Sequence, residues 1–263
     1  EIQSVWWQEL KEMANGLGLL FSCSIFDETP LPVLQPLGLD FVKIASAEIN
    51  NMDLIGSQIG LSETFVISTG MSYLDEITET VRLLKSKRVE NIILLECTSS
   101  YPAPASSIHL LNIDFLKSVF ALPVGFSDHA EGIHHSIAAV ARGARFIEKH
   151  FTLDKGLEGP DHKLSADIGE MTELVRNIRE IEQSMKCNRK MEISELELET
   201  RKIGRKSIIA SETIEAGGTI SKKNTILKRP GMGIQPREQI YLFGRKALKK
   251  IEKDHWISWD MVE

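Results

Sequence analysis

The chain has 263 residues, of which 26% are charged, and a formal net charge of −6 at pH 7. That charge gives no general attraction to nucleic acids or to acidic membrane surfaces. No apolar run reaches the length of a membrane span, and the charged, amphipathic opening stretch does not resemble a signal peptide. The three cysteines are scattered along the chain, which indicates reduced thiols in a cytoplasmic protein.

The first 186 residues alternate between short apolar runs and amphipathic segments. A helix is expected over 1–15, and strands at 18–27, 41–46, 65–70, 92–100, 123–128 and 145–151. Further helices are expected at 73–86, 112–120, 132–142 and 170–185, with a short or irregular one in the proline-containing stretch 28–38. This rhythm predicts a parallel sheet with right-handed crossovers.

Two architectures satisfy that rhythm, a doubly wound open sheet and a (β/α) barrel. Polar residues follow every predicted strand, which favours a barrel with one shared mouth. A complete barrel of this type has eight strands, whereas the pattern shows six. The expected fold of residues 1–186 is therefore a partial TIM-type (β/α) barrel.

The texture of the sequence changes after residue 186. Residues 187–205 are highly charged and predict a linker with a helical turn. Short apolar runs separated by glycines and charges follow over 206–263, and they predict a small, mostly β domain.

Two of the predicted strands lead into a histidine, His129 after PVGFSD and His150 after RFIEK. Neutral imidazoles are ligands for Mn, Co, Zn and Fe. Two such nitrogens on neighbouring strands would leave positions open for the oxygen of a substrate, as a Lewis-acid metal requires. The alternative is that each histidine makes a single hydrogen bond within the sheet or at its rim.

Hydroxyl groups and one ammonium group form a second set at the strand ends. Its members are Lys43, Ser46, Ser68, Thr69, Ser99 and Ser127. Around a barrel mouth they suit a phosphate or a carboxylate, although serine and threonine at strand ends also cap helices. The pattern leaves three interpretations of Glu48 open: a general base, a partner of Lys43, or a surface residue. Arg229 either reaches toward a ligand or lies at the surface.

Seven motifs occur along the chain in a fixed order. They are KIAS (43–46) with Glu48, STGM (68–71), CTSSYPAP (97–104), GFSDH (125–129), IEKHFTLD (147–154), GPDHK-S (159–165) and KRPG (228–231). Together they closely resemble the bacterial sialic acid synthases, which include N-acetylneuraminate synthase and its legionaminate and pseudaminate relatives. The resemblance covers essentially the whole chain and implies a TIM barrel followed by an antifreeze-like (SAF) domain.

The resemblance implies the condensation of phosphoenolpyruvate with an N-acetylmannosamine-type sugar to give a nonulosonic acid and phosphate. In that reaction C3 of phosphoenolpyruvate attacks the aldehyde carbon of the sugar. Water then adds at C2, and phosphate leaves by cleavage of its C–O bond. The family uses a divalent metal ion, with Mn expected here and Mg or Co as alternatives.

The resemblance also carries roles to individual residues. His129 and His150 match the two metal-ligand histidines, and Glu48 lies in the same catalytic site. Residues at phosphoenolpyruvate-binding positions are Ser24, Lys43, Ser46, Ser68, Ser99 and Ser127. Tyr101 and Asp161 match sugar-binding positions. Arg229 matches an arginine that contacts the acyl group of the sugar from the partner subunit, which implies a domain-swapped homodimer.

Family members begin with a segment that carries the first two barrel strands, a metal-proximal glutamate and another phosphate-binding lysine. The sequence shows no counterpart of that segment, so we expect little or no synthase turnover from these 263 residues alone. The alternative function is that of a non-catalytic homologue or fragment serving as a binding or scaffold subunit. Another aldol-type synthase that uses phosphoenolpyruvate fits the SAF-like end and the KRPG motif less well.

Overall fold

The computed structural model describes residues 4–186 and 192–263. Predictions that fall on residues 1–3 or 187–191, including the start of the first helix and of the linker, lie outside the described residues. The chain forms two compact units, Glu1–Cys187 and Asn188–Glu263, which we call unit 1 and unit 2. In the part of the chain that is described, no helix combines the length and the apolar character needed to cross a membrane.

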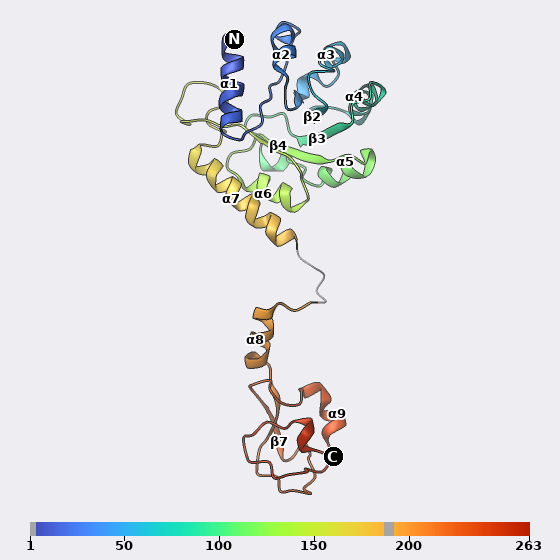
Figure 1. The fold of residues 1–263 in the computed structure, drawn as a ribbon, viewed down its shortest axis with the longest axis vertical. Coiled ribbons are helices and arrows are strands. Elements are labelled where there is room, and N and C mark those ends of the chain that lie inside the picture. Colours follow the sequence, from blue (N-terminus) through green and yellow to red (C-terminus); the bar gives the residue numbers. More distant parts are fainter. Residues whose placement is uncertain (1–3, 187–191) are drawn as a thin grey trace. The chain divides into compact units, whose positions relative to one another are not determined.

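Unit 1 contains a parallel sheet of five strands that lie side by side in chain order (Figure 1). The strands are β1 (Val42–Ile44), β2 (Thr64–Ser68), β3 (Asn91–Cys97), β4 (Val124–Asp128) and β5 (Ile147–Lys149). Each pairs with the next in parallel register, and at least one helix connects every pair. The result is half of a barrel of the TIM type. In such a barrel the carboxyl ends of all the strands lie at the same mouth.

The helices of unit 1 lie around this sheet (Figure 1). They are α1 (Ser4–Gly16), α2 (Leu31–Leu37), α3 (Met52–Ser57), α4 (Leu74–Ser86), α5 (Asn112–Phe120), α6 (His134–Ala141) and α7 (Ile168–Met185). All but α3 are expected from the sequence. The short helix α3 is capped by Asn51, whose side chain accepts a hydrogen bond from the Leu54 amide. Its six residues are too few to show a long apolar stripe in the sequence, so the pattern did not predict it.

The stretch 18–27, predicted as a strand, is not one. Only a single bridge joins it to the sheet, between Ser24 and Lys43. Besides one backbone bond, from the Asp40 amide to the Phe21 carbonyl at 3.1 Å, side chains supply the contacts. The Phe21 amide donates to the Asp40 carboxylate, and Ser22 Oγ donates to the Phe41 carbonyl. The sheet therefore has five strands where the sequence predicted six, yet Ser24 still lies beside Lys43.

Buried apolar side chains between the sheet and its helices hold unit 1 together. Phe65 and Ile67 on β2, Leu84 on α4 and Ile113 on α5 are fully buried in one cluster. Because a parallel sheet is covered on both faces, its strands appear in the sequence as nearly continuous apolar runs. This is why a strand was predicted from the sequence at each of the five places, and why the polar ends of the strands stand out.

In unit 2, helix α8 (Glu195–Gly204) is followed by two antiparallel strands that pair with each other, β6 (Ser207–Ala210) and β7 (Thr225–Lys228). The helix α9 (Gln239–Leu242) and several isolated bridges complete this unit around a small apolar core. The predicted linker contained only a helical turn, whereas α8 has ten residues. Its N-terminus carries a capping box formed by Ser194 and Glu197, a signal that the charged composition of this stretch obscures.

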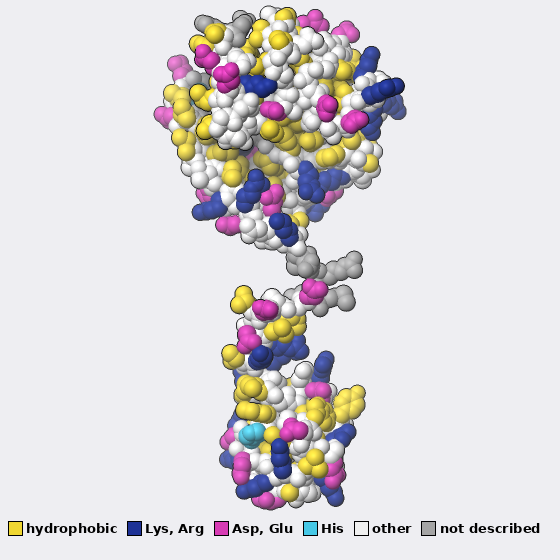
Figure 2. Space-filling view, in the orientation of Figure 1, with side chains coloured by type: hydrophobic (Ala, Val, Ile, Leu, Met, Phe, Trp, Pro, Cys, Tyr) yellow, Lys and Arg dark blue, Asp and Glu magenta, His cyan; other side chains and the backbone are white. Residues whose placement is uncertain are grey.

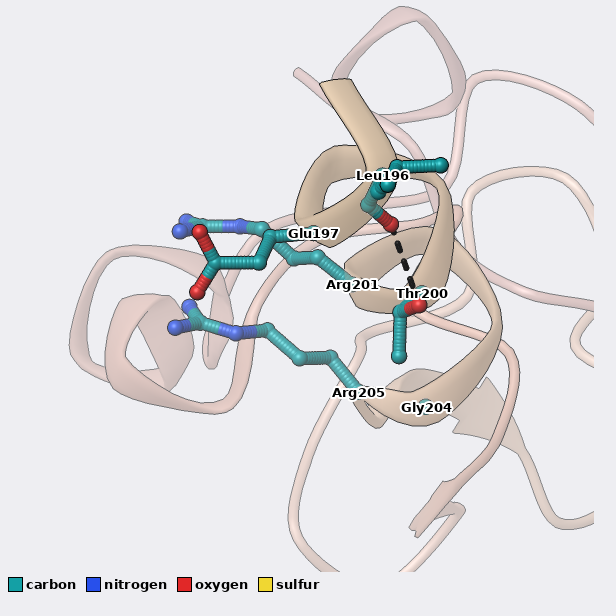
Figure 3. A pocket seen from close by; sticks show the side chains of 6 residues that line it. All are labelled: Leu196, Glu197, Thr200, Arg201, Gly204 and Arg205. Atoms are coloured by element: carbon teal, nitrogen blue, oxygen red, sulfur yellow. Dashed lines mark hydrogen bonds between the residues drawn. The ribbon is translucent and has the colours of Figure 1, made fainter. Parts of the chain in front are cut away.

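Helix α8 buries none of its side chains within unit 2, and Figure 2 shows hydrophobic side chains at its surface. A shallow groove of about 420 Å³ runs along it. In this groove the Glu197 carboxylate lies between the guanidinium groups of Arg201 and Arg205 (Figure 3). The carboxyl end of α8 reaches the KRPG segment, where the amide of Gly231 donates to the carbonyl of Lys202 at 2.8 Å.

Candidate active site

A cavity of about 300 Å³ opens at the carboxyl ends of the strands in unit 1. It is lined by Ser24, Lys43, Ala45, Ser46, Ser68, Tyr101, Ser127, His129, Glu148, Lys149 and His150. This is the end of a parallel sheet at which TIM-type proteins bind their ligands. The structure thus brings together most of the predicted metal and phosphoenolpyruvate residues, together with Tyr101.

The alternation of side chains along β4 and β5 builds one wall of this cavity. Ser127 and His129 are two residues apart, as are Glu148 and His150, so each pair projects from the same face of the sheet. The register aligns Ser127 with Glu148 directly. Glu148 was not predicted as a site residue, although its position two residues before His150 in a predicted strand was the signal that identifies it.

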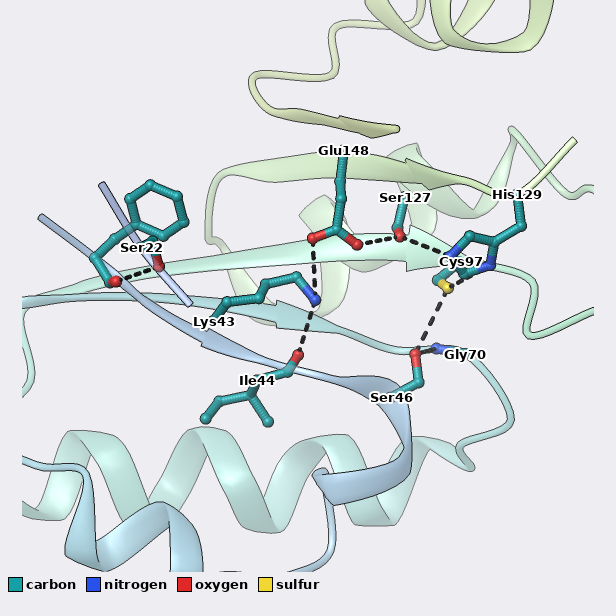
Figure 4. A network of polar contacts seen from close by, with 10 residues as sticks. Ser22, Lys43, Ile44, Ser46, Gly70, Cys97, Ser127, His129 and Glu148 are labelled. Atoms are coloured by element: carbon teal, nitrogen blue, oxygen red, sulfur yellow. Dashed lines mark hydrogen bonds and ion pairs between the residues drawn. The ribbon is translucent and has the colours of Figure 1, made fainter. Parts of the chain in front are cut away.

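Lys43, Glu148 and Ser127 form a connected polar network (Figure 4). Lys43 Nζ lies 3.1 Å from Glu148 Oε2, and Ser127 Oγ donates to Glu148 Oε1 at 2.7 Å. The Lys43 residue is only 8% exposed. The carboxylate that pairs with Lys43 is therefore Glu148 rather than Glu48, the partner considered from the sequence.

Serine hydroxyl groups surround Gly70 beside this network. Ser46 Oγ accepts a hydrogen bond from the Gly70 amide at 3.0 Å, and it also approaches Cys97 Sγ at 3.6 Å. The Oγ atoms of Ser68 and Ser99 are buried and have no protein partner. A buried hydroxyl without a partner is unfavourable, so these two groups are consistent with a site that a polar ligand completes.

The space around Gly70 gives a specific prediction. A Cβ at this position would approach Ser99 Oγ to 2.3 Å and Ser46 Oγ to 2.9 Å. We expect Gly70→Ala to displace both hydroxyls and to weaken the binding of phosphoenolpyruvate at least about tenfold, since each lost charge-assisted hydrogen bond is worth roughly 1.5–3 kcal/mol. Isothermal titration calorimetry measures the change.

The matched control is Gly56→Ala in α3, where a Cβ would meet nothing within 4 Å. It should bind phosphoenolpyruvate as the unsubstituted chain does. Unchanged affinity in Gly70→Ala would mean that the hydroxyls around Gly70 do not contact this ligand.

His129 is held in one orientation. Its Nδ1 lies 2.8 Å from the Thr98 carbonyl, an acceptor only, so Nδ1 carries the proton and Nε2 presents a lone pair. The residue is 6% exposed, and its ring centroid is 5.3 Å from that of His150. Tyr101 packs against both rings, with centroid distances of 4.3 Å to His129 and 5.7 Å to His150.

The environment of His150 favours the form that binds metals. Burial lowers its pKa, and the neighbouring His129 ring lowers it further, so the imidazole stays neutral at pH 7. A divalent ion fits this pair by the chemistry of its nitrogen donors. Within the described part of the chain no group of three or more His, Cys, Asp or Glu side chains could hold such an ion. The described residues thus offer two adjacent imidazoles here rather than a larger donor set.

Four predicted site residues do not line the cavity, and one of them is Ser99, described above beside Gly70. Glu48 lies on a 3₁₀ turn, Ser46–Glu48, where its carboxylate accepts a hydrogen bond from Asn51 Nδ2 at 2.9 Å. Asp161 lies at the rim, with its side chain 51% exposed and Oδ2 3.7 Å from His150 Nδ1. Arg229 is an exposed residue of unit 2.

Comparisons with known proteins agree with the resemblance of the motifs. The NeuB family matches residues 1–190, and the SAF domain matches residues 205–263. N,N'-diacetyllegionaminic acid synthase of Campylobacter jejuni subsp. jejuni is 39% identical over 252 residues, which cover 95% of this chain and 75% of that protein. Human N-acetylneuraminate-9-phosphate synthase is 32% identical over 260 residues, covering 98% and 72%.

Solved structures show the same relationship. N-acetylneuraminic acid synthetase of Leptospira borgpetersenii superposes with a TM-score of 0.69 at 34% identity, covering 76% of this chain and 69% of that one. A putative spore coat polysaccharide biosynthesis protein E of Chromobacterium violaceum has a TM-score of 0.73 over 100% of this chain and 79% of its own. Its identity is 22%, so it supports the fold alone. The chain therefore belongs to the NeuB family, the family of the sialic acid synthases.

Proposed function

We propose that this protein condenses phosphoenolpyruvate with an N-acetylmannosamine-type sugar to form a nonulosonic acid and phosphate. One observation carries the proposal: a single cavity at the strand ends combines a buried lysine, serine hydroxyls and two adjacent imidazoles. The relatives named above are synthases of legionaminic, N-acetylneuraminic and N-acetylneuraminate-9-phosphate products, which supports this class of reaction.

The serines and Lys43 are proposed to bind phosphoenolpyruvate. Ammonium and hydroxyl groups donate hydrogen bonds to phosphate and carboxylate oxygens, and those bonds are stronger in a site that excludes water. The residues assigned to this role are Ser24, Lys43, Ser46, Ser68, Ser99 and Ser127. The buried hydroxyls of Ser68 and Ser99, which lack protein partners, are the donors most in need of such a ligand.

His129 and His150 are proposed to hold a divalent cation, with Mn preferred and Mg or Co as alternatives. When bound, such an ion polarises the aldehyde oxygen of the open-chain sugar. The hydrogen bond from His129 Nδ1 to Thr98 fixes the ring, and Nε2, which lies 3.4 Å from Ser127 Oγ, is the nitrogen that would bind the ion. Tyr101 and Asp161, both near the imidazoles, are proposed to contact the sugar.

The reaction joins C3 of phosphoenolpyruvate to the aldehyde carbon, and water adds at C2 before phosphate leaves by C–O cleavage. Glu148 is the carboxylate that lines the cavity, so we assign to it the acceptance of a proton from that water. Glu48 could take part only after its side chain leaves Asn51. Lys43 stabilises the departing phosphate.

Unit 2 is proposed to contribute Arg229 to the active site of a second copy. Arg229 is exposed, and its segment is fastened to the end of α8 through Gly231 and Lys202. An exposed guanidinium on an anchored turn can donate hydrogen bonds to the acyl oxygen of the sugar. The resulting assembly would be a domain-swapped homodimer.

The direct test uses the protein expressed from its complete gene with phosphoenolpyruvate labelled by ¹⁸O at the bridging oxygen. The sugars are N-acetylmannosamine and a panel of other 2-acetamido sugars. We expect one sugar to yield a nonulosonic acid, identified by mass spectrometry, and ¹⁸O in the released phosphate. Release of phosphate without sugar dependence, or retention of ¹⁸O in the organic product, would contradict the proposal.

Removal of the metal should weaken the binding of phosphoenolpyruvate. Glu148 neutralises Lys43, and the ammonium of Lys149 pairs with Asp128 at 3.4 Å behind the cavity, so the residues lining the cavity supply little net positive charge. Part of the attraction for a highly charged anion must then come from a bound cation. We expect EDTA to raise the dissociation constant at least about tenfold, and Mn²⁺ to restore it. Equal affinity with and without EDTA would assign the anion site to Lys43 and the serines alone.

A further inference from the structure

A buried ion pair lies directly behind the two histidines. Asp128, the last residue of β4, and Lys149, the last residue of β5, are register partners. Their charged groups are 3.4 Å apart, and their side chains are 0% and 2% exposed. Neither residue has a part in the proposed chemistry.

The pair holds the backbone that follows His129. Asp128 Oδ1 accepts a hydrogen bond from the Ala130 amide at 2.9 Å, and Lys149 Nζ donates to the Ala130 carbonyl. Asp128 Oδ2 also accepts from Ser136 Oγ on α6 at 2.6 Å. Both polar backbone groups of Ala130 therefore depend on the ion pair.

The alternation of the strands relates the pair to the imidazoles. Each member immediately precedes a histidine, so the charged groups lie on the opposite face of the sheet from the two rings. Because Asp128 binds across to Lys149, the pair also fixes how far β4 can slide along β5. The positions of His129 and His150 relative to one another follow from that register.

Stability alone gives no adequate reason for this arrangement. The desolvation of two buried charges largely cancels their attraction, and an apolar pair of similar volume is often as stable. A buried ion pair does, however, restrict geometry more closely than apolar packing does, because its hydrogen bonds are directional.

We propose that Asp128 and Lys149 are positioning residues that hold the imidazoles of His129 and His150 at the separation and in the tautomer suited to a divalent cation. This rests on the proposed metal role of the two histidines. The pair acts through the Ala130 backbone and the β4–β5 register, and it touches neither the metal nor the substrates.

The test compares Asp128→Leu, Lys149→Met and the double variant. Two readouts are used on the 263-residue chain: the tautomer of His129, from long-range ¹H–¹⁵N NMR spectra, and Mn²⁺ affinity, from the EPR signal of the free ion. We expect one Nδ1–H tautomer in the unsubstituted chain and a mixture in the variants. Mn²⁺ affinity should fall about 10- to 100-fold, the range found when residues behind metal ligands are changed.

Leu84→Ala is the control for lost stability, since Leu84 is fully buried in the core on α4. It should lower the melting temperature and leave the His129 tautomer and Mn²⁺ affinity unchanged. The double variant has no unpaired buried charge, so it keeps the test available if a single variant fails to fold.

Three results separate the possibilities. A double variant with the original tautomer and Mn²⁺ affinity would overturn the positioning role. A mixed tautomer with weakened Mn²⁺ binding would support it. If the unsubstituted chain binds no Mn²⁺, the proposed metal role fails, and the tautomer of His129 alone decides whether the ion pair positions the ring.

Discussion

Turnover is expected to fall roughly a thousandfold when His129 or His150 is replaced by alanine, because several kcal/mol of Lewis-acid stabilisation would be lost and each 1.4 kcal/mol is tenfold. Their rings are 5.3 Å apart, and each would supply one nitrogen. Neither position can be filled by the other ring, so the two single variants should be similarly impaired. Steady-state assays over a range of Mn²⁺ concentrations, on the protein from its complete gene, measure the loss.

The matched control is His134→Ala, an exposed histidine on α6. It should turn over at the original rate with the original Mn²⁺ dependence. Activity retained by either His129→Ala or His150→Ala, together with unchanged Mn²⁺ binding, would remove that histidine from the metal site.

Lys43→Met should weaken phosphoenolpyruvate binding about a hundredfold. The substitution removes a charge-assisted hydrogen bond worth roughly 1.5–3 kcal/mol, and it leaves the Glu148 carboxylate next to the incoming phosphate. The double variant Lys43→Met/Glu148→Gln removes that repulsion, so it should bind more tightly than Lys43→Met while remaining weaker than the original chain. Calorimetric titrations of the original chain, Lys43→Met, Glu148→Gln and the double variant give the coupling between the two side chains.

Lys155→Met provides the comparison for loss of a lysine elsewhere in unit 1. Lys155 pairs with Glu170 at the start of α7 and does not line the cavity, so its removal should leave the affinity unchanged. A double variant that binds no better than Lys43→Met would show that Glu148 does not oppose the ligand.

The parallel half-barrel could be predicted because its strands are buried on both faces. Runs such as residues 65–68 and 92–97 contain little but apolar residues, and polar groups begin where each strand ends. The stretch 18–27 has a similar composition, yet Leu19 and Leu20 are 58% and 73% exposed. The Phe21 amide donates to the Asp40 side chain, and the bond to the Phe41 carbonyl comes from the Ser22 hydroxyl, so side chains take part where a strand pattern predicts backbone pairing alone.

The site was predictable where it depends on strand ends and less so where it depends on pairing. The two histidines and the serines follow from their places after strands. The choice between Glu48 and Glu148 required the register of β4 with β5, which places Glu148 opposite Ser127. Glu48, closer to Lys43 in the sequence, is directed toward Asn51 by a short 3₁₀ turn.

The irregular stretch beside β1 has a consequence for solubility. An open strand edge offers a row of free amides and carbonyls on which another chain can add a strand, a common route to aggregation. Here the Phe21 amide is bound to Asp40, the Ser22 hydroxyl covers the Phe41 carbonyl, and Ser24 bridges Lys43. These contacts keep one register, since each joins residues 19 apart in the sequence, so the stretch already occupies groups along the edge of β1 that another strand would need for pairing.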